Sequence, residues 1–256
     1  MRGLADKTFL IAGGATGIGA ATAKRLAAEG AWVAIGDNNI AGATGTAEQI
    51  AADGGRAIAV EFDLADERSV HRLVETTLAE FGAIHGLHNV GADLSEDNLG
   101  RDTTILDTGM DVWQRTLDVN LLGYVRTIRA VLPHLLAQGG GSIVNTSSGA
   151  ALGSDPAHVA YGASKAAVNH LTRHVAVNWG THNIRSNGVM PGLVMGETQE
   201  RQNDVALQQA FLMFGKTSRL GKPDDLAAIT AFLLSDEAEW ITGQVWYIGG
   251  GSHLRQ

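Results

Sequence analysis

The sequence has 256 residues, of which 45% are hydrophobic and 18% charged, so the chain can build a sizeable core and lacks the composition of a disordered protein. Its formal net charge of -8 disfavours nucleic acid as a partner, and the absence of cysteine excludes disulfides, thiolate nucleophiles and cysteine–metal sites. The first residues lack the apolar core of a signal peptide, and no segment approaches the roughly 20 apolar residues of a membrane span. We therefore expect a cytoplasmic protein with no membrane partner.

Short apolar runs alternate with helical patterns along the chain. In chain order we predict strand 8–12, helix 18–29, strand 32–35, helix 41–52, strand 57–62, helix 66–81, strand 84–89, a loop over the site at 93–107, helix 112–137, strand 142–146, helix 158–179, strand 184–190, helices 200–214 and 224–234, and strand 244–248. This alternation predicts right-handed βαβ units and a parallel sheet with helices on both faces. No linker or repeat interrupts it, so we expect one α/β domain over residues 1–256.

A glycine-rich turn follows the first predicted strand. Gly13, Gly17 and Gly19 let the backbone turn tightly and approach a ligand closely. The helix that follows offers free N–H groups and the positive end of its dipole to a pyrophosphate. The spacing differs from the usual Gly-x-Gly-x-x-Gly fingerprint, but the strand before and the helix after fit a dinucleotide site. The alternative is a turn that serves only helix–sheet packing.

Asp37 ends the second predicted strand and indicates which cofactor the protein binds. A carboxylate there can accept hydrogen bonds from both adenosine ribose hydroxyls and would repel a 2′-phosphate. Asn38 follows it, and the glycine turn contains no Arg or Lys, so NAD is favoured over NADP. Asp63, after the third strand, can reach the adenine edge, although helix capping explains it equally well. Gly91 leaves room for a ligand in the crevice at the strand ends.

Tyr161 and Lys165 are four residues apart in a predicted helix, so their side chains share one face. A phenol titrates near pH ~10 in water. An ammonium group one turn away favours the phenolate and brings tyrosine toward a useful acid/base range. Ser148, after an apolar run, can hydrogen-bond the same substrate oxygen. A Tyr-x-x-x-Lys pair also occurs on ordinary exposed helices, so the remaining motifs decide its meaning.

Together these motifs resemble those of the short-chain dehydrogenase/reductase family, and the resemblance covers nearly the whole chain, from Gly13 to Gly192. The resemblance implies a Rossmann-type doubly wound sheet of about seven strands in the order 3-2-1-4-5-6-7. It also implies an NAD-dependent oxidoreductase that acts on CH–OH groups and interconverts a secondary alcohol and a ketone. A homotetramer or homodimer is implied as well, formed through helices 112–137 and 158–179.

The resemblance assigns catalytic roles to four residues. Tyr161 is the acid/base, Lys165 lowers its pKa and holds the nicotinamide ribose, and Ser148 polarises the substrate carbonyl. Ser147 is the second choice for that serine. Asn120 holds a water in the proton relay to Lys165, although an asparagine in an apolar helix also needs a partner for structural reasons alone.

The same resemblance assigns the cofactor to a larger set: Gly13, Thr16, Gly17, Ile18, Gly19, Asp37, Asn38, Asp63, Leu64, Asn89, Val90, Gly91, Tyr161, Lys165, Pro191, Gly192 and Val194. Gly196 stands where the family commonly has a threonine that contacts the nicotinamide carboxamide, so we prefer the backbone of Val194 for that contact. We expect a substrate lid at about 193–216. The histidines lack metal-site spacing, and we expect no metal.

Two other functions remain open at this point. The nearest is a 3-oxoacyl-thioester reductase, but such enzymes mostly use NADPH, which Asp37 disfavours. The other is a catalytically silent NAD-binding regulator, against which the intact Ser148, Tyr161 and Lys165 argue. We expect a small-molecule alcohol or ketone as the substrate.

Overall fold

Seven parallel strands form one sheet in the computed structural model of the chain, which describes residues 1–153, 156–196, 209, 213 and 215–253. The order β3-β2-β1-β4-β5-β6-β7 confirms the predicted topology. The strands are β1 (Thr8–Ala12), β2 (Trp32–Asp37), β3 (Arg56–Glu61), β4 (Gly86–Asn89), β5 (Gly141–Thr146), β6 (Ile184–Pro191) and β7 (Val245–Ile248). β1 lies near the centre and is buried along its whole length, as a parallel strand covered on both faces must be.

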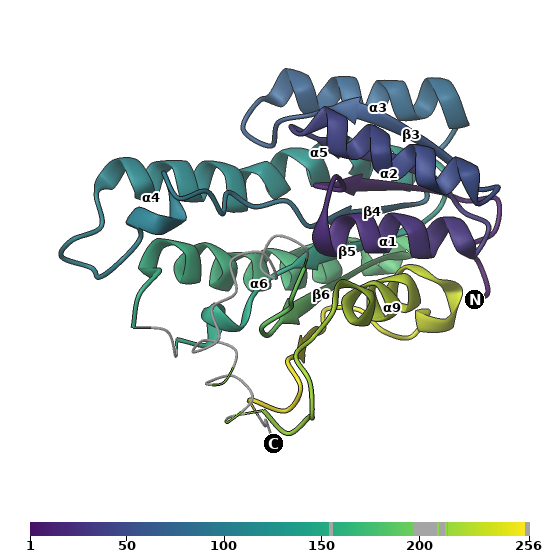
Figure 1. The fold of residues 1–256 in the computed structure, drawn as a ribbon. Helices are drawn as coiled ribbons and strands as arrows, with labels where there is room; N and C mark the ends of the chain where they lie inside the picture. Colours follow the sequence, from purple (N-terminus) through teal and green to yellow (C-terminus); the bar gives the residue numbers. More distant parts are fainter. Residues whose placement is uncertain (154–155, 197–208, 210–212, 214, 254–256) are drawn as a thin grey trace.

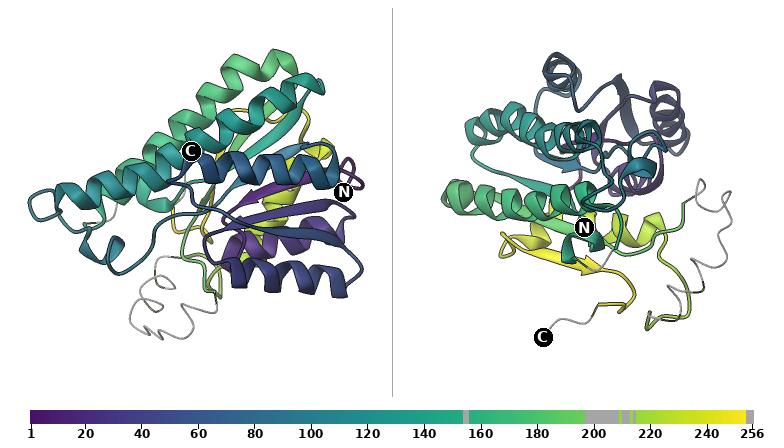
Figure 2. Two further views of the ribbon diagram at one scale, coloured as in Figure 1. Left: turned by 90° about the horizontal axis from the view of Figure 1, so that it is seen from above. Right: turned by 90° about the vertical axis from the view of Figure 1, so that its left-hand side faces the viewer.

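Helices cover both faces of the sheet (Figures 1 and 2). One apolar cluster joins the sheet to α1 (Gly17–Ala28), α2 (Ile40–Ala52) and α9 (Pro223–Leu234). A second cluster joins the other face to α3 (Glu67–Phe81), α5 (Gly123–Ala137) and α6 (Val159–Trp179). Of the helices that the structure describes, none has the length and apolar character needed to cross a membrane.

The helix predicted at 112–137 is present and contains a π-helical turn. It consists of α4 (Met110–Leu117), a π-helical turn (η2, Asp118–Leu122) and α5. Asn120 lies within this turn, and π-turns of this kind often occur at functional sites. The apolar periodicity from which the helix was predicted does not reveal this turn, because a single inserted residue barely disturbs it. α4 and the start of α6 project beyond the sheet (Figure 1).

Short 3-10 turns fill several connections. They are η1 (Leu99–Arg101), η3 (Gly149–Leu152), η4 (Gly180–His182) and η5 (Asp236–Ala238), and η1 lies within the predicted loop at 93–107. Asp66 caps α3, as expected, by accepting the N–H of Arg68 at 3.0 Å. Most of the helix predicted at 200–214, and with it most of the predicted lid, lies outside the described residues.

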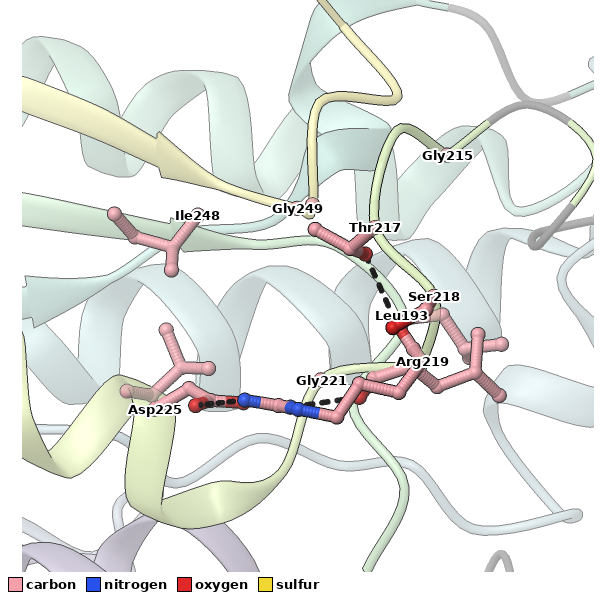
Figure 3. A pocket seen from close by; sticks show the side chains of 12 residues that line it. Leu193, Gly215, Thr217, Ser218, Arg219, Gly221, Asp225, Ile248 and Gly249 are labelled. Carbon is pink, nitrogen blue, oxygen red and sulfur yellow. Dashed lines mark hydrogen bonds and ion pairs between the residues drawn. The ribbon is translucent and has the colours of Figure 1, made fainter.

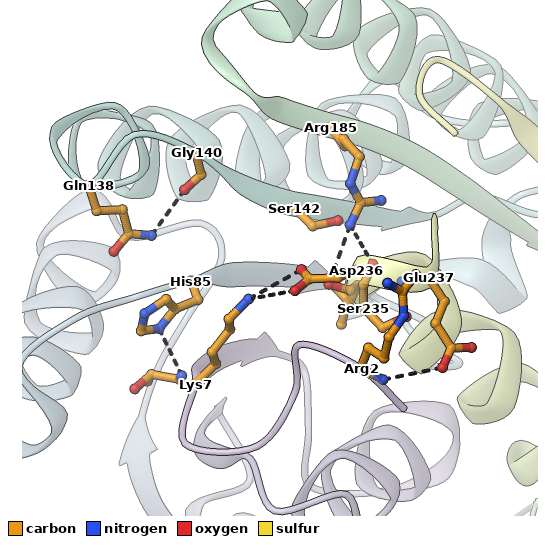
Figure 4. A network of polar contacts seen from close by, with 12 residues as sticks. Arg2, Lys7, His85, Gln138, Gly140, Ser142, Arg185, Ser235, Asp236 and Glu237 are labelled. Atoms are coloured by element: carbon orange, nitrogen blue, oxygen red, sulfur yellow. Dashed lines mark hydrogen bonds and ion pairs between the residues drawn. The ribbon is translucent and has the colours of Figure 1, made fainter. Parts of the chain in front are cut away.

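Polar contacts close the amino-terminal edge of the sheet (Figure 4). Arg185, at the start of β6, donates to the carbonyl oxygen of Leu233 at 2.6 Å and so holds the end of α9. Lys7 forms an ion pair with Asp236 at 3.2 Å. Burial and the charge of Lys7 lower the pKa of His85, so this ring is neutral at pH 7. The network ties the chain's first residues and α9 to the sheet, at the edge away from the glycine turn.

Candidate active site

The glycine-rich turn packs on itself and on the end of β4. A Cβ added to Gly13, whose φ is 105°, would lie 2.4 Å from the backbone of Gly91, and one added to Gly19 would lie 1.9 Å from the carbonyl oxygen of Gly13. These glycines are therefore required by the packing of the turn. Gly17 differs, because a Cβ there would meet no described atom within 4 Å although its φ is 55°. Its open side is where a ligand can approach the amino terminus of α1.

Asp37 holds the turn from the end of β2. Its carboxylate accepts the N–H of Ala15 at 2.9 Å and the N–H of Asn39 at 2.9 Å. A carboxylate offers about four lone-pair sites, so Asp37, which is partly exposed, keeps acceptor capacity for further hydroxyls. Asn38 beside it is exposed. Thr16 precedes α1 with an extended backbone, and Ile18 lies partly buried in the first turn of that helix.

Asn89, predicted to contact the cofactor, has its side chain in the core. It is fully buried, donates to the side-chain oxygen of Asn145 at 2.9 Å, and accepts from the hydroxyl of Thr127 at 2.7 Å. Asn145 donates in turn to Thr172 at 3.1 Å. This chain of hydrogen bonds fixes the carboxyl ends of β4 and β5 between α5 and α6. The side chain of Asn89 therefore serves the core, and the residue has no surface exposed to a ligand.

Three further predicted contacts, Leu64, Asp63 and Val90, differ in how far they are buried. Leu64 is buried, and a Cβ added to Gly91 would lie only 2.9 Å from its side chain. Asp63 accepts the N–H of Ala65 at 2.8 Å and so forms a local turn after β3, while Asp66 serves as the helix cap. Val90 is partly buried and packs against the cluster beneath α1.

The structure places Ser148, and not Ser147, against Tyr161. Ser147 is buried and donates its hydroxyl to the carbonyl oxygen of Lys165 at 3.1 Å. Ser148 is partly exposed, accepts the N–H of Ala150 at 3.2 Å, and lies beside the Tyr161 phenol, whose pKa its hydroxyl lowers. The two adjacent serines therefore face different parts of the protein, and the geometry supports Ser148 as the residue that reaches a substrate oxygen.

Lys165 is fully buried behind Tyr161. Its Nζ donates to the carbonyl oxygen of Thr146 at 2.9 Å and to the hydroxyl of Tyr124 at 3.4 Å, and it lies 5.7 Å from the centre of the Tyr161 ring. Burial lowers the pKa of Lys165 to about 7. Tyr124, a residue that sequence reasoning missed, has no pattern to reveal it, because its contact with Lys165 spans 41 residues.

The expectation that Lys165 lowers the pKa of Tyr161 does not hold in this structure. Burial raises the pKa of the phenol, and the neighbouring hydroxyl of Ser148 acts in the opposite direction. The physical reason is that the same burial makes Lys165 only partly protonated near neutral pH, so it is a weaker cation than an exposed lysine.

Asn120 is buried in the π-helical turn that packs against α6. Its side-chain oxygen accepts the N–H of Asp93 at 2.9 Å. Its Nδ2 is buried and finds no hydrogen-bond acceptor among the described residues. A buried amide nitrogen normally has a partner, so this one is available to a water or ligand, and the oxygen meets the structural need that the sequence indicated.

The backbone after β6 is held by hydrogen bonds to β7 and by a bridge to Gly221. Pro191 ends β6, and Gly192 donates its N–H to Ile248 at 3.0 Å. Val194 then forms an isolated parallel bridge with Gly221. In such a bridge the N–H and C=O of the central residue point away from the partner. The N–H and C=O of Val194 therefore do not take part in the hydrogen bonds of this bridge.

Tyr247, from β7, packs across two glycines that border this region. A Cβ on Gly149, next to Ser148, would lie 3.2 Å from the Tyr247 ring, and one on Gly192 would lie 3.0 Å from its hydroxyl. Sequence reasoning missed Tyr247. The available signal was the pair of glycines beside two predicted site residues, which indicates a bulky neighbour at both positions.

A pocket of about 490 Å³ opens on the α9 side of β6 and β7 (Figure 3). An ion pair between Arg219 and Asp225, at 2.6 Å, forms part of its wall and lowers the pKa of Asp225 to about 2. The described residues that line it come from 193, 215, 217–221, 225–226 and 248–250, and not from the segments that carry Ser148 and Tyr161. Within the described ranges, no three His, Asp or Glu side chains are grouped to hold a metal ion.

Comparison with known sequences decides the family. A family model described as "Enoyl-(Acyl carrier protein) reductase" matches residues 13–253. The chain is also 36% identical over 247 residues to a 7α-hydroxysteroid dehydrogenase of Bacteroides fragilis, covering 96% of this chain and 94% of that protein. The chain belongs to the short-chain dehydrogenase/reductase family. A cyclohexanol dehydrogenase of Acinetobacter sp. is 33% identical over 249 residues, covering 96% and 94% of the two chains.

A solved short-chain dehydrogenase/reductase structure gives the same picture of the fold. A 7α-hydroxysteroid dehydrogenase in complex with NADH and 7-oxo-glycochenodeoxycholic acid has a TM-score of 0.91 and 30% identity, covering 97% of this chain and 95% of that one. The chain is thus similar to alcohol and ketone oxidoreductases along nearly its whole length, and the residues that the family motifs assign to chemistry lie at the carboxyl ends of the strands.

Proposed function

We propose that the protein is an NAD-dependent oxidoreductase that interconverts a secondary alcohol and a ketone, with Tyr161 as acid/base. The observation that carries the proposal is that Ser148 lies beside Tyr161 and lowers the pKa of its phenol, with Lys165 buried directly behind the ring. Two hydroxyl groups that meet at a partly exposed position can both bind one substrate oxygen. A buried lysine with a pKa of about 7 can exchange protons behind them.

The residues present fit a dinucleotide. The Gly13–Gly91 contact leaves no room for a side chain, Gly17 is open, and the first N–H groups of α1 have no intrahelical acceptor, which suits a pyrophosphate. Asp37 would accept from the adenosine ribose, Lys165 would hold the nicotinamide ribose, and the backbone of Val194 would contact the carboxamide. When bound, the nicotinamide supplies the hydride acceptor or donor.

The chain's own residues supply orientation and the proton. In oxidation, Ser148 donates to the alcohol oxygen, and the phenolate of Tyr161 takes the hydroxyl proton. In reduction, the Tyr161 phenol donates a proton to the carbonyl oxygen, which Ser148 polarises. Lys165 passes protons between Tyr161 and the region of Asn120, whose buried Nδ2 can hold a water there.

The preference for NAD rests on Asp37, whose carboxylate is anchored by two backbone N–H groups and so stands fixed against a 2′-phosphate. For the substrate, the small and apolar residues Gly149, Ala150 and Leu152, which follow Ser148, suit an alicyclic alcohol or ketone. The hydroxysteroid and cyclohexanol dehydrogenases among the relatives support this class.

The deciding experiment is a NADH-absorbance screen of the purified protein with alicyclic alcohols and NAD, alicyclic ketones and NADH, and a 3-oxoacyl thioester as the competing class. Turnover of an alicyclic pair with a preference for NAD supports the proposal. Turnover confined to the thioester and NADPH would replace it by the reductase alternative. Binding of NADH without turnover of any member would favour the silent regulator.

A further inference from the structure

The connection between β4 and α4 contacts both the π-helical turn that carries Asn120 and α6, the helix that carries Tyr161 and Lys165. We call residues 93–102 of this connection the strap. At its first residue, the N–H of Asp93 donates to the side-chain oxygen of Asn120 at 2.9 Å. At its last residue, the carboxylate of Asp102 accepts two N–H groups from the first turn of α6, those of Ala160 at 3.0 Å and Tyr161 at 2.8 Å.

Asp102 supplies the cap of the helix that carries Tyr161. Helices are usually capped by the side chain of the residue just before them, but this cap comes from 58 residues earlier in the chain. Asp102 is only 1% exposed, and its backbone carbonyl also accepts the N–H of His158 at 3.1 Å. The buried negative charge is compensated by these N–H groups and by the positive end of the helix dipole.

The strap is itself anchored to α4 at two points. The carboxylate of Asp93 forms an ion pair with Arg115 of α4 at 2.8 Å. The side chain of Asn98 donates to the hydroxyl of Thr116, also on α4, at 3.0 Å, and both residues are buried. The strap therefore links α4 and the π-helical turn to the amino terminus of α6 through hydrogen bonds and an ion pair.

We propose that Asp102 is a positioning residue for Tyr161, a role that rests on the proposed function of that tyrosine. Tyr161 is the third residue of α6 and lies in its first turn, the part of a helix whose N–H groups lack intrahelical acceptors and which frays most readily. By binding the Tyr161 N–H directly, the Asp102 carboxylate keeps this turn formed and the phenol against Ser148. The strap fixes Asn120 in the same way through Asp93.

The test compares this carboxylate with an equivalent cap elsewhere. Asp66 caps α3 by accepting the N–H of Arg68 at 3.0 Å, and α3 carries none of the proposed catalytic residues. Asp102→Ala, Asp102→Asn and Asp66→Ala are purified as full chains. Turnover of the best alicyclic substrate and the Kd for NADH, from its fluorescence, are measured for each.

We expect kcat of Asp102→Ala to fall about 100-fold, as for a misplacement of about 1 Å, with the Kd for NADH changed less than about 3-fold. Asp102→Asn keeps one acceptor oxygen and the side-chain volume, so its kcat should lie between that of Asp102→Ala and the wild type. Asp66→Ala should keep kcat within about 2-fold despite losing a cap. If Asp102→Ala and Asp66→Ala lose kcat equally, or if the loss lies in NADH binding alone, the positioning role is wrong.

Hydrogen–deuterium exchange tests the anchoring independently of turnover. The amides of Ala160 and Tyr161 should exchange at least about 10-fold faster in Asp102→Asn than in the wild type, with α3 unchanged. Unchanged exchange overturns the proposal even if Asp102→Ala fails to fold. Faster exchange in a protein whose wild type turns over no alcohol or ketone would overturn the proposed function and leave the anchoring by Asp102 in place.

Discussion

Ser148 lies beside the phenol of Tyr161, the proposed acid/base, and acts on its pKa. Burial raises the pKa of that phenol, and the hydroxyl of Ser148 offsets part of the rise. Ser147, one residue earlier, turns its hydroxyl to the backbone carbonyl of Lys165 instead. Two adjacent and chemically identical side chains thus have different roles, which mutation can separate.

Replacing each serine by alanine should give different losses. Ser148→Ala removes a donor to the reacting oxygen and the contact that lowers the Tyr161 pKa, so kcat should fall about 100-fold or more. Ser147→Ala removes one buried hydrogen bond, which costs about 1 kcal/mol of unfolding free energy, and kcat should stay within a few-fold of the wild type. Steady-state kinetics and thermal unfolding of both variants check this. A larger kcat loss in Ser147→Ala would reverse the assignment.

The two reaction directions should depend differently on pH. Because the pKa of Tyr161 is raised, the phenol is protonated at neutral pH, which is the form that reduction needs. Oxidation needs the phenolate, so its kcat/KM should rise with pH between about pH 7 and pH 10, while reduction stays level from about pH 6 to pH 8. The check is a pair of pH profiles in both directions. An oxidation rate that peaks below neutrality contradicts the expected protonation of Tyr161.

Asp37→Ala should weaken NAD binding and relax the discrimination against NADP. The variant loses acceptors for the ribose hydroxyls and the charge that repels a 2′-phosphate, so kcat/KM with NAD should fall about 10- to 100-fold. The midpoint of thermal unfolding should also fall, because the N–H groups of Ala15 and Asn39 lose their acceptor. Kinetics with both cofactors measure the change. An unaltered ratio of kcat/KM for NAD and NADP would show that another residue sets the preference.

Lys165→Met should abolish turnover without destabilising the fold. Burial lowers the pKa of Lys165 from 10.5 to about 7, so the charged lysine is unfavourable in the folded state. This penalty is complete below about pH 7 and disappears as the pH rises toward the unfolded value. Lys165→Met should therefore unfold at or above the wild-type temperature at pH 6, with the difference shrinking toward pH 10. Lys24→Met, on the exposed surface of α1, is the control and should show no such trend.

Much of the fold could be predicted from local pattern. The alternation of apolar runs with helical stretches placed the strands within about two residues, and the glycine turn, Asp37 and the Tyr161–Lys165 pair lie together at the carboxyl ends of the strands. These features were accessible because each depends on residues close in sequence, and because the topology brings the strand ends to one edge.

The long-range contacts could not be predicted in this way. Asp102 reaches α6 from 58 residues away, and Tyr124 reaches Lys165 from 41 residues away, with no periodicity to reveal either contact. The side chain of Asn89 lies in the core because Asn145 and Thr127 offer it partners from two other elements. The raised pKa of Tyr161 depends on burial, which follows from packing and has no signature in a five-residue motif.

The most direct test of the central claim is Tyr161→Phe, measured for turnover and for NADH binding with the same protein. The substitution removes only the phenolic oxygen, so we predict that turnover of an alicyclic alcohol or ketone is lost while the Kd for NADH, from its fluorescence, stays within about 3-fold of the wild type. Substantial turnover in Tyr161→Phe would contradict the account, because the proton would then be transferred by another group.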